Sequence, residues 1–413
     1  MHREVVERRR WISERRFLHA LNYCMVLPGP EAQQLATYIG WLTNGVRGAV
    51  GAGSLFILPG FFVMLLLSIV YAQFGDVRWV SGLLFGLQAA VVVLVVQALV
   101  RISRRTINAP AQIAIAASAF IALFFFAVPF PIVIVAAGLV GWLLGRTRGT
   151  WLPEPDDSSD DAGSPTLVAD DEAVPARGRR NALIAAAVCL VAWLAPVLVL
   201  LLVLGQENIF TQEAVLFSKV AVVTFGGAYA GLAYVSQVAV QQYGWLSTAD
   251  MTTGLGLAET TPGPLVLVMQ FVGFLAAYNH PGSLPPLVAG ILGAIVTVWV
   301  IFVPCFMFIF AGAPYVERLR HSRVVHYALV GIGAAVVGVI ANLALWFALS
   351  TFFQVDTYTA GPLRVSVPDL STVNVEAVVI AGVAALLVFR FRLPTLVILG
   401  ICALMGMTAA FIG

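Results

Sequence analysis

Two Pro-Gly-Pro motifs interrupt apolar segments of this chain, at residues 28–30 and 262–264. Proline lacks a backbone donor and clashes with the preceding helical turn, so each motif must end a helix. The helix that restarts after the motif presents free N–H groups and the positive end of its dipole. Such a helix start can bind an anion without a cationic side chain. The pattern therefore predicts two anion-binding helix starts, although either motif alone could be a structural kink.

Small and hydroxyl-bearing residues at the motifs could take part in the same chemistry. Gly29 and Gly263 are the central residues of the motifs, and Thr260 and Thr261 precede the second one. A threonine hydroxyl could cap a helix at the break or donate a hydrogen bond to an oxyanion. We therefore expect these four residues to contact the anion.

Two carboxylates flank the motifs, Glu259 before the second and Glu31 after the first. An anion site has no obvious use for a carboxylate unless it carries protons. A buried membrane carboxylate can bind a proton near neutral pH, and we predict this role for both residues. Glu31 has a structural alternative, because an acid in the first helical turn stabilises the helix dipole.

The apolar segment 212–241 holds a further group of candidates. Lys219 is the one lysine among 23 basic residues. A charged side chain at the middle of a bilayer costs about 2.5–3.5 kcal/mol, so Lys219 either snorkels to the membrane surface or faces a dianion. Gly226 and Gly227 could bring the backbone close to a ligand or to another helix. Tyr229 could donate a hydrogen bond to the ligand or belong to the core.

The remaining polar and sulfur-containing residues are less specific. Asn22 and Gln33 lie in apolar runs and either contact the ligand or form hydrogen bonds between helices. The four cysteines lie in apolar stretches without metal-ligand spacing, and we interpret them as core residues. The sequence contains no Walker motif, dinucleotide-binding fingerprint or metal constellation. We therefore expect no enzymatic activity, no cofactor and no metal.

These residues must be held by helices that lie in a membrane. The chain is 60% hydrophobic and 11% charged, whereas a soluble chain averages about 25% charged residues. This composition predicts an all-α polytopic membrane protein. Residues 110–145 are too long for one span of about 20 residues and contain Pro129 and Pro131, so we predict a hairpin of two short helices. The other predicted apolar segments are 17–45, 49–72, 79–100, 182–205, 212–241, 251–279, 285–312, 324–352, 375–389 and 393–412.

The two motifs belong to an internal repeat. Residues 11–13 match residues 245–247 at the spacing that separates the motifs, and residues 58–60 match residues 303–305 at a longer spacing. The second half therefore carries extra residues, which we place around Asn279–Pro286. Duplicated breaks at matching positions of two halves indicate a transporter's substrate site.

The charges of matched loops predict that the two halves are inverted. Arg101, Arg104 and Arg105 follow one helix of the first half, whereas the matched loop of the second half carries Asp356. Cytoplasmic loops are rich in arginine and lysine, so matched loops should lie on opposite sides of the membrane. The resulting fold is two inverted-topology repeats with broken helices.

The predicted organisation has three parts. Residues 1–145 form the first repeat, and residues 182–413 form a connecting helix and the second repeat. Residues 146–181 are rich in Asp, Ser and Arg and cannot bury a core, so we predict a disordered cytoplasmic linker. This topology places the arginine-rich residues 1–16 outside, against the charge rule, unless they form an amphipathic helix that packs on the protein.

Three long strings of sequence carry a family resemblance: W-I-S-E-R-R-F-L-H-A-L-N-Y-C-M-V-L-P-G-P-E-A-Q-Q-L-A-T-Y-I-G-W at 11–41, F-S-K-V-A-V-V-T-F-G-G-A-Y-A at 217–230 and G-L-A-E-T-T-P-G-P at 256–264. They resemble the CHR family of chromate transporters, over both halves and nearly all of the chain except the linker. The resemblance implies a multi-pass protein of the bacterial cytoplasmic membrane that exports chromate with the proton-motive force and confers chromate resistance. Sulfate, an isosteric dianion, is the expected competitor.

One departure from the family pattern concerns the start of the chain. Two-repeat members carry an F-G-G-P segment before the first W-I-S run, and only the second repeat keeps a version here, at residues 225–227. The first repeat is therefore N-terminally incomplete. We expect the natural protein to begin upstream, with a helix before Met1 that matches residues 212–234.

Other classes of function fit the sequence less well. Uptake or exchange of sulfate or another tetrahedral oxyanion is the nearest alternative. An enzyme acting on a lipid phosphate would need a paired acid and base or a His/Asp cluster, which the sequence lacks. A membrane scaffold or sensor would leave the duplicated breaks unexplained. We expect membrane lipid but no nucleic acid as a partner, and a homodimer is compatible with the sequence.

Overall fold

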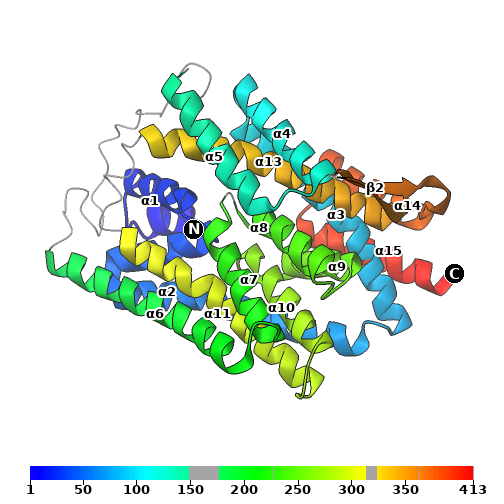
Figure 1. The fold of residues 1–413 in the computed structure, drawn as a ribbon, viewed down its shortest axis with the longest axis horizontal. Coiled ribbons are helices and arrows are strands. Elements are labelled where there is room, and N and C mark those ends of the chain that lie inside the picture. Colours follow the sequence, from blue (N-terminus) through cyan, green and yellow to red (C-terminus); the bar gives the residue numbers. More distant parts are fainter. Residues whose placement is uncertain (148–175, 226, 313–322, 362, 413) are drawn as a thin grey trace.

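The computed structural model describes residues 1–147, 176–225, 227–312, 323–361 and 363–412, and most of them are helical (Figure 1). The first half comprises η1 (Arg3–Arg8), α1 (Glu14–Val26), α2 (Glu31–Phe74), α3 (Arg78–Thr106), α4 (Pro110–Phe126) and α5 (Phe130–Thr147). The connecting helix is α6 (Ala176–Leu204). The second half comprises α7 (Ile209–Val223), α8 (Ala228–Val235), η3 (Ser236–Gln242), α9 (Thr248–Thr260), η4 (Leu265–Leu267), α10 (Val268–Asn279), α11 (Pro286–Gly312), α13 (Arg323–Phe352), β1 (Gln354–Ala360), β2 (Leu363–Asp369), η6 (Leu370–Thr372), α14 (Val375–Ala385), η7 (Leu386–Phe391) and α15 (Thr395–Ile412).

The helices confirm the predicted fold class of a polytopic α-helical membrane protein. Six described helices are long and apolar enough to cross a membrane by length and composition, namely α2, α3, α5, α6, α11 and α13. The antiparallel hairpin of β1 and β2 is an addition that the sequence analysis did not include. Its strands are rich in Val, Thr and Tyr, which favour strands, but they are short and lie between two strongly apolar helices.

Residues 110–145 form the predicted helical hairpin. α4 ends at Ala127, which takes a left-handed conformation (φ 47°), and α5 starts at Phe130. The segment 212–241, in contrast, is not the single helix that its hydropathy predicted. It is interrupted between Val223 and Ala228, because the chain turns through Gly227 (φ 97°), a conformation that favours glycine.

The two halves repeat one another in local hydrogen bonding. The π-helices η1 and η3 occupy matched positions of the repeat. Each is followed by a tryptophan whose backbone N–H donates a hydrogen bond back to the π-helix. The N–H of Trp11 donates to Val5 O, and that of Trp245 donates to Ala239 O, both at 2.9 Å. Ser13 and Ser247 then cap α1 and α9 through their side chains. The repeat read from the sequence therefore corresponds to a repeated backbone structure.

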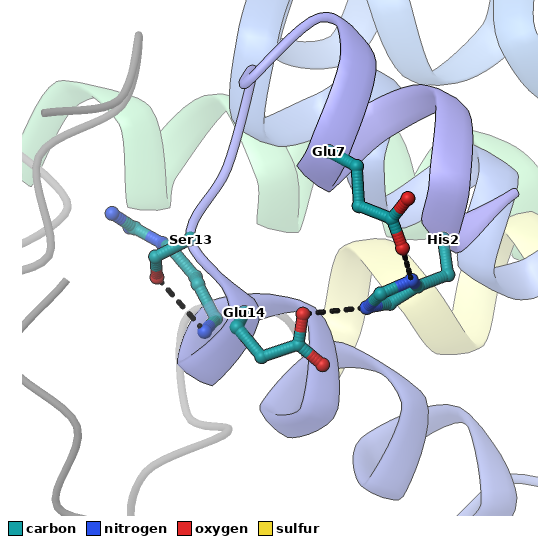
Figure 2. Close-up of polar contacts among 5 residues, drawn as sticks. His2, Glu7, Ser13 and Glu14 are labelled. Atoms are coloured by element: carbon teal, nitrogen blue, oxygen red, sulfur yellow. Dashed lines mark hydrogen bonds and ion pairs between the residues drawn. The ribbon is translucent and has the colours of Figure 1, made fainter. Parts of the chain in front are cut away.

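The arginine-rich N-terminus packs against α1. Val5 is buried on one side of η1, as expected for an amphipathic helix. Figure 2 shows His2 between two carboxylates, with Nδ1 3.3 Å from Glu7 and Nε2 2.5 Å from Glu14. The same view shows Ser13 Oγ accepting a hydrogen bond from the backbone N–H of Arg16 at the start of α1. These contacts hold residues 2–14 onto the first half of the protein.

The extra residues of the second half form the loop between α10 and α11. In the first half the matched position is a bend within α2, at Asn44 and Gly45, which divides this element into two helices. The two helices of α2 in the first half, and α10 and α11 in the second half, pack against each other at glycines. An added Cβ at Gly48 would lie 2.2 Å from Gly40 O, and one at Gly293 would lie 2.5 Å from Gly273 O.

Each half completes the packing of the other half. α3 packs against α14 and α15, and α13 packs against α4 and α5 (Figure 1). A Cβ added at Gly86 would lie only 2.0 Å from Cys402 O. A Cβ added at the matched Gly331 would lie 2.3 Å from Ala137 O. Thr106, the last residue of α3, lies beside Gly333 in the first part of α13, as expected for matched helices that run in opposite directions. This reciprocal arrangement fits the predicted inverted repeat.

Most of the predicted linker, residues 146–181, lies outside the described residues. At its edges α5 extends to Thr147 and α6 starts at Ala176.

Replacing Gly86 or Gly331 by valine should destabilise the protein, because each new side chain would collide with the backbone of the facing helix. We expect a cost of about 1–3 kcal/mol, typical of an overpacked core. The measurement is the midpoint of thermal unfolding in detergent. Gly400→Val is the control, since no atom lies within 4 Å of an added Cβ there. An equal loss of stability in all three variants would contradict the reciprocal packing.

Candidate functional site

Three interruptions of helices lie near one another: residues 28–30 in the first half, and residues 224–225 with Gly227, and residues 261–264, in the second half. The backbone N–H of Gly29 donates to Thr224 O at 2.9 Å, which joins the first interruption to the second. α8, which starts after the second interruption, packs against η4, which starts after the third. Figure 1 shows α8 and α9 in the middle of the molecule. The two predicted breaks therefore converge, together with a third that hydropathy did not reveal.

The first break is held by the second half of the protein. Gly29 is buried and has a φ of 112°, a conformation that side chains rarely adopt. An added Cβ would lie 2.9 Å from Cys305 Sγ on α11 and 3.1 Å from Gln34 Nε2. Gln34 Nε2 also donates to Pro28 O at 2.7 Å. This carbonyl belongs to the broken part of the chain, so Gln34 replaces a backbone donor that the break removes.

The second break is held by the first half in the reciprocal way. Gly263 has a φ of 138°, and an added Cβ there would lie 3.4 Å from Gly60 Cα on α2. An added Cβ at Gly60 would lie 2.6 Å from Pro262 O. Gly60 and Cys305 occupy matched positions of the repeat, so each break packs on the same position of the opposite half.

The helices that start at the three interruptions lack side-chain caps. Their N-cap residues are Pro30, Pro264 and Gly227, and none of them caps its helix through a side chain. The helices that lead toward the interruptions are capped instead by the side chains of Ser13, Asn208 and Ser247. Three helix starts with free N–H groups and positive dipole ends are thus available to an anion.

Tyr229 and Glu259 form a hydrogen bond between two helix ends near the breaks. Tyr229 is buried, and its hydroxyl donates to Glu259 Oε1 at 2.6 Å. This hydrogen bond connects the first turn of α8 to the last turn of α9. The contact therefore ties a carboxyl group to the helix start that follows the second interruption.

Thr260 and Thr261 end α9 rather than start the next helix. Thr260 Oγ1 donates to Leu257 O at 2.7 Å, and Thr261 Oγ1 donates to Ala258 O at 2.8 Å. The hydroxyl proton of Thr260 satisfies a carbonyl at the end of the helix, and that of Thr261 adds a second hydrogen bond to Ala258 O, which also accepts the backbone N–H of Thr261. In this conformation each hydroxyl can accept a hydrogen bond but has no second proton to donate.

The structure places the other predicted residues at different distances from the breaks. Glu31 is the first residue of α2, in the position that stabilises a helix dipole. Gln33 is buried and donates to Thr37 Oγ1 at 3.0 Å within α2. Lys219 lies on the exposed face of α7, about 7.5 Å along the helix before Thr224. Gly227 lies in the second interruption, whereas Gly226 and the side chain of Asn22 lie outside the described residues.

Several contacts at this site were missing from the sequence analysis. Thr224 supplies the carbonyl that holds Gly29, and its buried hydroxyl has no hydrogen-bond partner among the described residues. Cys305 is a free cysteine in the core, as predicted, but its position against Gly29 gives it a structural role at the break. The match between residues 58–60 and residues 303–305 was the sequence feature that could have indicated the roles of Gly60 and Cys305 at the breaks. The described residues contain no cluster of potential metal ligands.

Comparison with known proteins gives a consistent family assignment. A family model described as Chromate transporter matches residues 1–142 and 211–407, one region in each half. The chain is 32% identical over 400 residues to a "Chromate transport protein" of Pseudomonas aeruginosa, covering 94% of this chain and 86% of that protein. It is 24% identical over 393 residues to the "Chromate transport protein" of Cupriavidus metallidurans, with coverages of 93% and 85%.

A third relative is the "Probable chromate transport protein" of Synechococcus elongatus, 25% identical over 370 residues, with coverages of 87% and 81%. No solved structure matches the chain. The family match and the six apolar helices describe a multi-pass membrane protein, and a bacterial inner membrane fits the bacterial sources of these relatives.

Replacing Gly29 or Gly263 by alanine should impair anion binding while leaving the rest of the protein folded. Each φ lies where an L-residue is strained by about 1–3 kcal/mol, so the helix start beyond it should shift. We expect at least a tenfold loss of affinity for chromate, measured by isothermal titration of the purified protein.

The control for this pair is Gly282→Ala. Gly282 also has a positive φ, of 61°, but it lies in the α10–α11 loop and has no atom within 4 Å of an added Cβ. Equal affinities for the wild type and both break variants would show that the breaks do not form the anion site.

Proposed function

This chain belongs to the chromate transporter family, and from that premise we propose that it exports chromate across the cytoplasmic membrane and so confers chromate resistance. The observation that carries the proposal is the reciprocal pair of breaks, in which Gly29 packs on Cys305 and Gly263 packs beside Gly60. Paired breaks between inverted repeats are the arrangement in which secondary transporters bind substrate.

In the proposed mechanism, chromate binds between the starts of α2, α8 and η4. Backbone N–H groups and helix dipoles supply the attraction, and Gly29, Gly227 and Gly263 allow the backbone to approach the oxygens. Lys219 adds positive charge at the edge of the site. Rocking of one half against the other then exposes the anion to alternate sides of the membrane.

Membrane energetics favour the outward direction. The cytoplasm is electrically negative, so moving a dianion outward releases about 4.6 kcal/mol at a potential of 100 mV. We propose that protons moving inward add to this driving force, with Glu259 and Glu31 as carriers. The hydrogen bond from Tyr229 to Glu259 supports the choice of Glu259, because it couples a carboxylate to the start of α8.

Transport of sulfate or another tetrahedral oxyanion is the second candidate. Uncapped helix starts recognise charge and shape, and sulfate shares both with chromate. The described contacts include no donor that would separate the two dianions. We therefore expect sulfate to compete with chromate at the same site.

Everted membrane vesicles from a chromate-sensitive bacterium that expresses this protein should accumulate chromate when respiration is energised. Export in the cell corresponds to uptake in these vesicles, and a protonophore should abolish it. Lys219→Ala should lower the rate by at least tenfold, because it removes the ammonium group at the edge of the site, whereas Lys219→Arg keeps the charge and serves as the control.

Excess sulfate should slow the uptake, because it competes for the site. Accumulation in right-side-out vesicles instead of everted ones would contradict export and favour oxyanion uptake. Vesicles with confirmed expression but no chromate movement in either orientation would contradict chromate transport altogether.

A further inference from the structure

A second carboxyl group, away from the three breaks, lies in the interior of the second half. Glu213 lies on α7 and is 0% exposed. Neither of its carboxyl oxygens has a hydrogen-bond partner among the described residues. In the sequence Glu213 lies near the start of an apolar segment, where an acid usually lies at the membrane surface, so hydropathy gives no sign of its burial.

The pocket around this carboxyl group is built by glycines. An added Cβ at Gly293 on α11 would lie 3.0 Å from Glu213 Oε2, so any other residue there would crowd the carboxyl group. At Gly293, α11 also packs closely against Gly273 of α10, since a Cβ added at Gly293 would lie 2.5 Å from Gly273 O. Because residues 273 and 293 are glycines without side chains, the side chain of Glu213 fits between its own helix α7 and helices α10 and α11.

Thr297 supplies a second unpaired polar group at the same crossing. It lies one turn beyond Gly293, and an added Cβ at Gly273 would lie 2.0 Å from its Oγ1. This hydroxyl is buried without a hydrogen-bond partner among the described residues. Other buried hydroxyls donate to the carbonyl four residues earlier, such as those of Ser68 and Ser236.

The matched crossing in the first half shows that the close approach of the two helices does not require the hydroxyl group of Thr297. Gly40 crosses Gly48 there, and Ala52 occupies the position that matches Thr297. The same helix geometry therefore forms with an apolar residue. A hydroxyl group at 297, in the helix crossing that also encloses the carboxyl group of Glu213, indicates a purpose other than close packing.

The charge state of Glu213 follows from its surroundings. A carboxylate buried without a partner costs several kcal/mol, whereas its protonated form is neutral. A metal cation would need about six oxygen ligands, and the described unpaired oxygens at this crossing are the carboxyl pair and one hydroxyl. The pocket therefore fits a proton rather than a metal ion.

Other titratable groups on the surrounding elements lie at a distance. Lys219 is six residues further along α7, about 9 Å, and on the exposed face. Tyr278 is about 7.5 Å along α10 beyond Gly273 and donates to Ala72 O. The other described titratable groups of α6, α8, α11 and the loop before α7 are Arg179, Arg180, Cys189, Glu207, Tyr229, Tyr234 and Cys305. None of them hydrogen-bonds to Glu213.

We propose that Glu213, with Thr297, is a proton-binding site through which the inward proton flow is coupled to movement of the second half. This inference rests on the proposed proton-driven export. α7 carries Glu213 and ends at Thr224, whose carbonyl holds Gly29 at the first break. Sliding of α7 along α10 and α11 would open the glycine pocket to water and release the proton, while pulling on the break that holds the anion. Binding of a new proton restores the packed arrangement.

The predicted topology fits this role. α6 leads away from the cytoplasmic linker, so the start of α7 lies toward the outer face, where the proton concentration is higher. Thr211 Oγ1 donates to Leu200 O near the end of α6, which places Glu213 at that level of the membrane. Glu259 lies further along, at the breaks, and would act as the inner proton carrier.

The test uses purified protein in proteoliposomes, with chromate efflux driven either by a pH gradient or by a membrane potential. Glu213→Gln keeps the shape and imitates the protonated form. We expect it to lose at least nine-tenths of the stimulation by the pH gradient while retaining efflux driven by the potential. Glu207→Gln, a change of an exposed carboxylate shortly before α7, is the matched control and should behave as the wild type.

Infrared spectroscopy provides a measurement that is independent of transport. The wild type should show the carbonyl band of a buried protonated carboxyl group at neutral pH, and Glu213→Gln should lack that band. An ionised Glu213 in the resting protein would overturn the proposal even if the variant fails to fold. Full stimulation of Glu213→Gln by the pH gradient, or stimulation of the wild type by sodium instead of protons, would also overturn it.

The two proposals fail in different ways. If wild-type proteoliposomes do not move chromate, the proposed function is wrong, and the infrared band still decides whether Glu213 holds a proton. If they export chromate under a pH gradient and the variant does so equally, only the role of Glu213 is wrong.

Discussion

The structure depends on how a membrane protein satisfies backbone groups where its helices break. Water cannot reach such groups in the hydrocarbon region, so irregular backbone is tolerated only when protein or a polar cavity surrounds it. Here each Pro-Gly-Pro break packs on the opposite half, with Gly29 against Cys305 and Gly263 beside Gly60. Gln34 and Thr224 supply the missing partners of the first break. The same contacts that make the breaks possible therefore bring them together, and they join the two halves.

This reciprocity links packing to function. Helix α3 of the first half packs on α14 and α15, and α13 of the second half packs on α4 and α5, and these contacts bury the glycine faces of α3 and α13. Neither half therefore forms its core alone. The helix starts of α2, α8 and η4, which have no side-chain caps, lie where the two halves meet, the joint between the halves. A dianion bound there would contact both halves at once. Glu213 lies outside this joint but on the helix that holds one of its breaks.

The sequence was sufficient for the fold class, the repeat and both Pro-Gly-Pro breaks, because proline chemistry and apolar length act locally. It also predicted the hairpin of α4 and α5 from length and Pro129. Hydropathy could not reveal the break at 224–227, since a turn through Gly227 needs no polar residue. It missed Glu213 for a related reason: its neighbour Gly293 comes from a distant part of the chain. Lys219, chosen because it is the one lysine, lies on the exposed face of α7, about 7.5 Å along the helix before Thr224, and its contact with the anion stays a prediction.

The central claim is that the two matched breaks form one anion site at the joint between the halves. The most direct measurement is anomalous diffraction at the chromium edge from crystals of this protein soaked in chromate. The account predicts one chromium peak per chain between the starts of α2 and η4, displaced by excess sulfate. A peak on the exposed face of α7 near Lys219, or two separate peaks with one at each break, would contradict it.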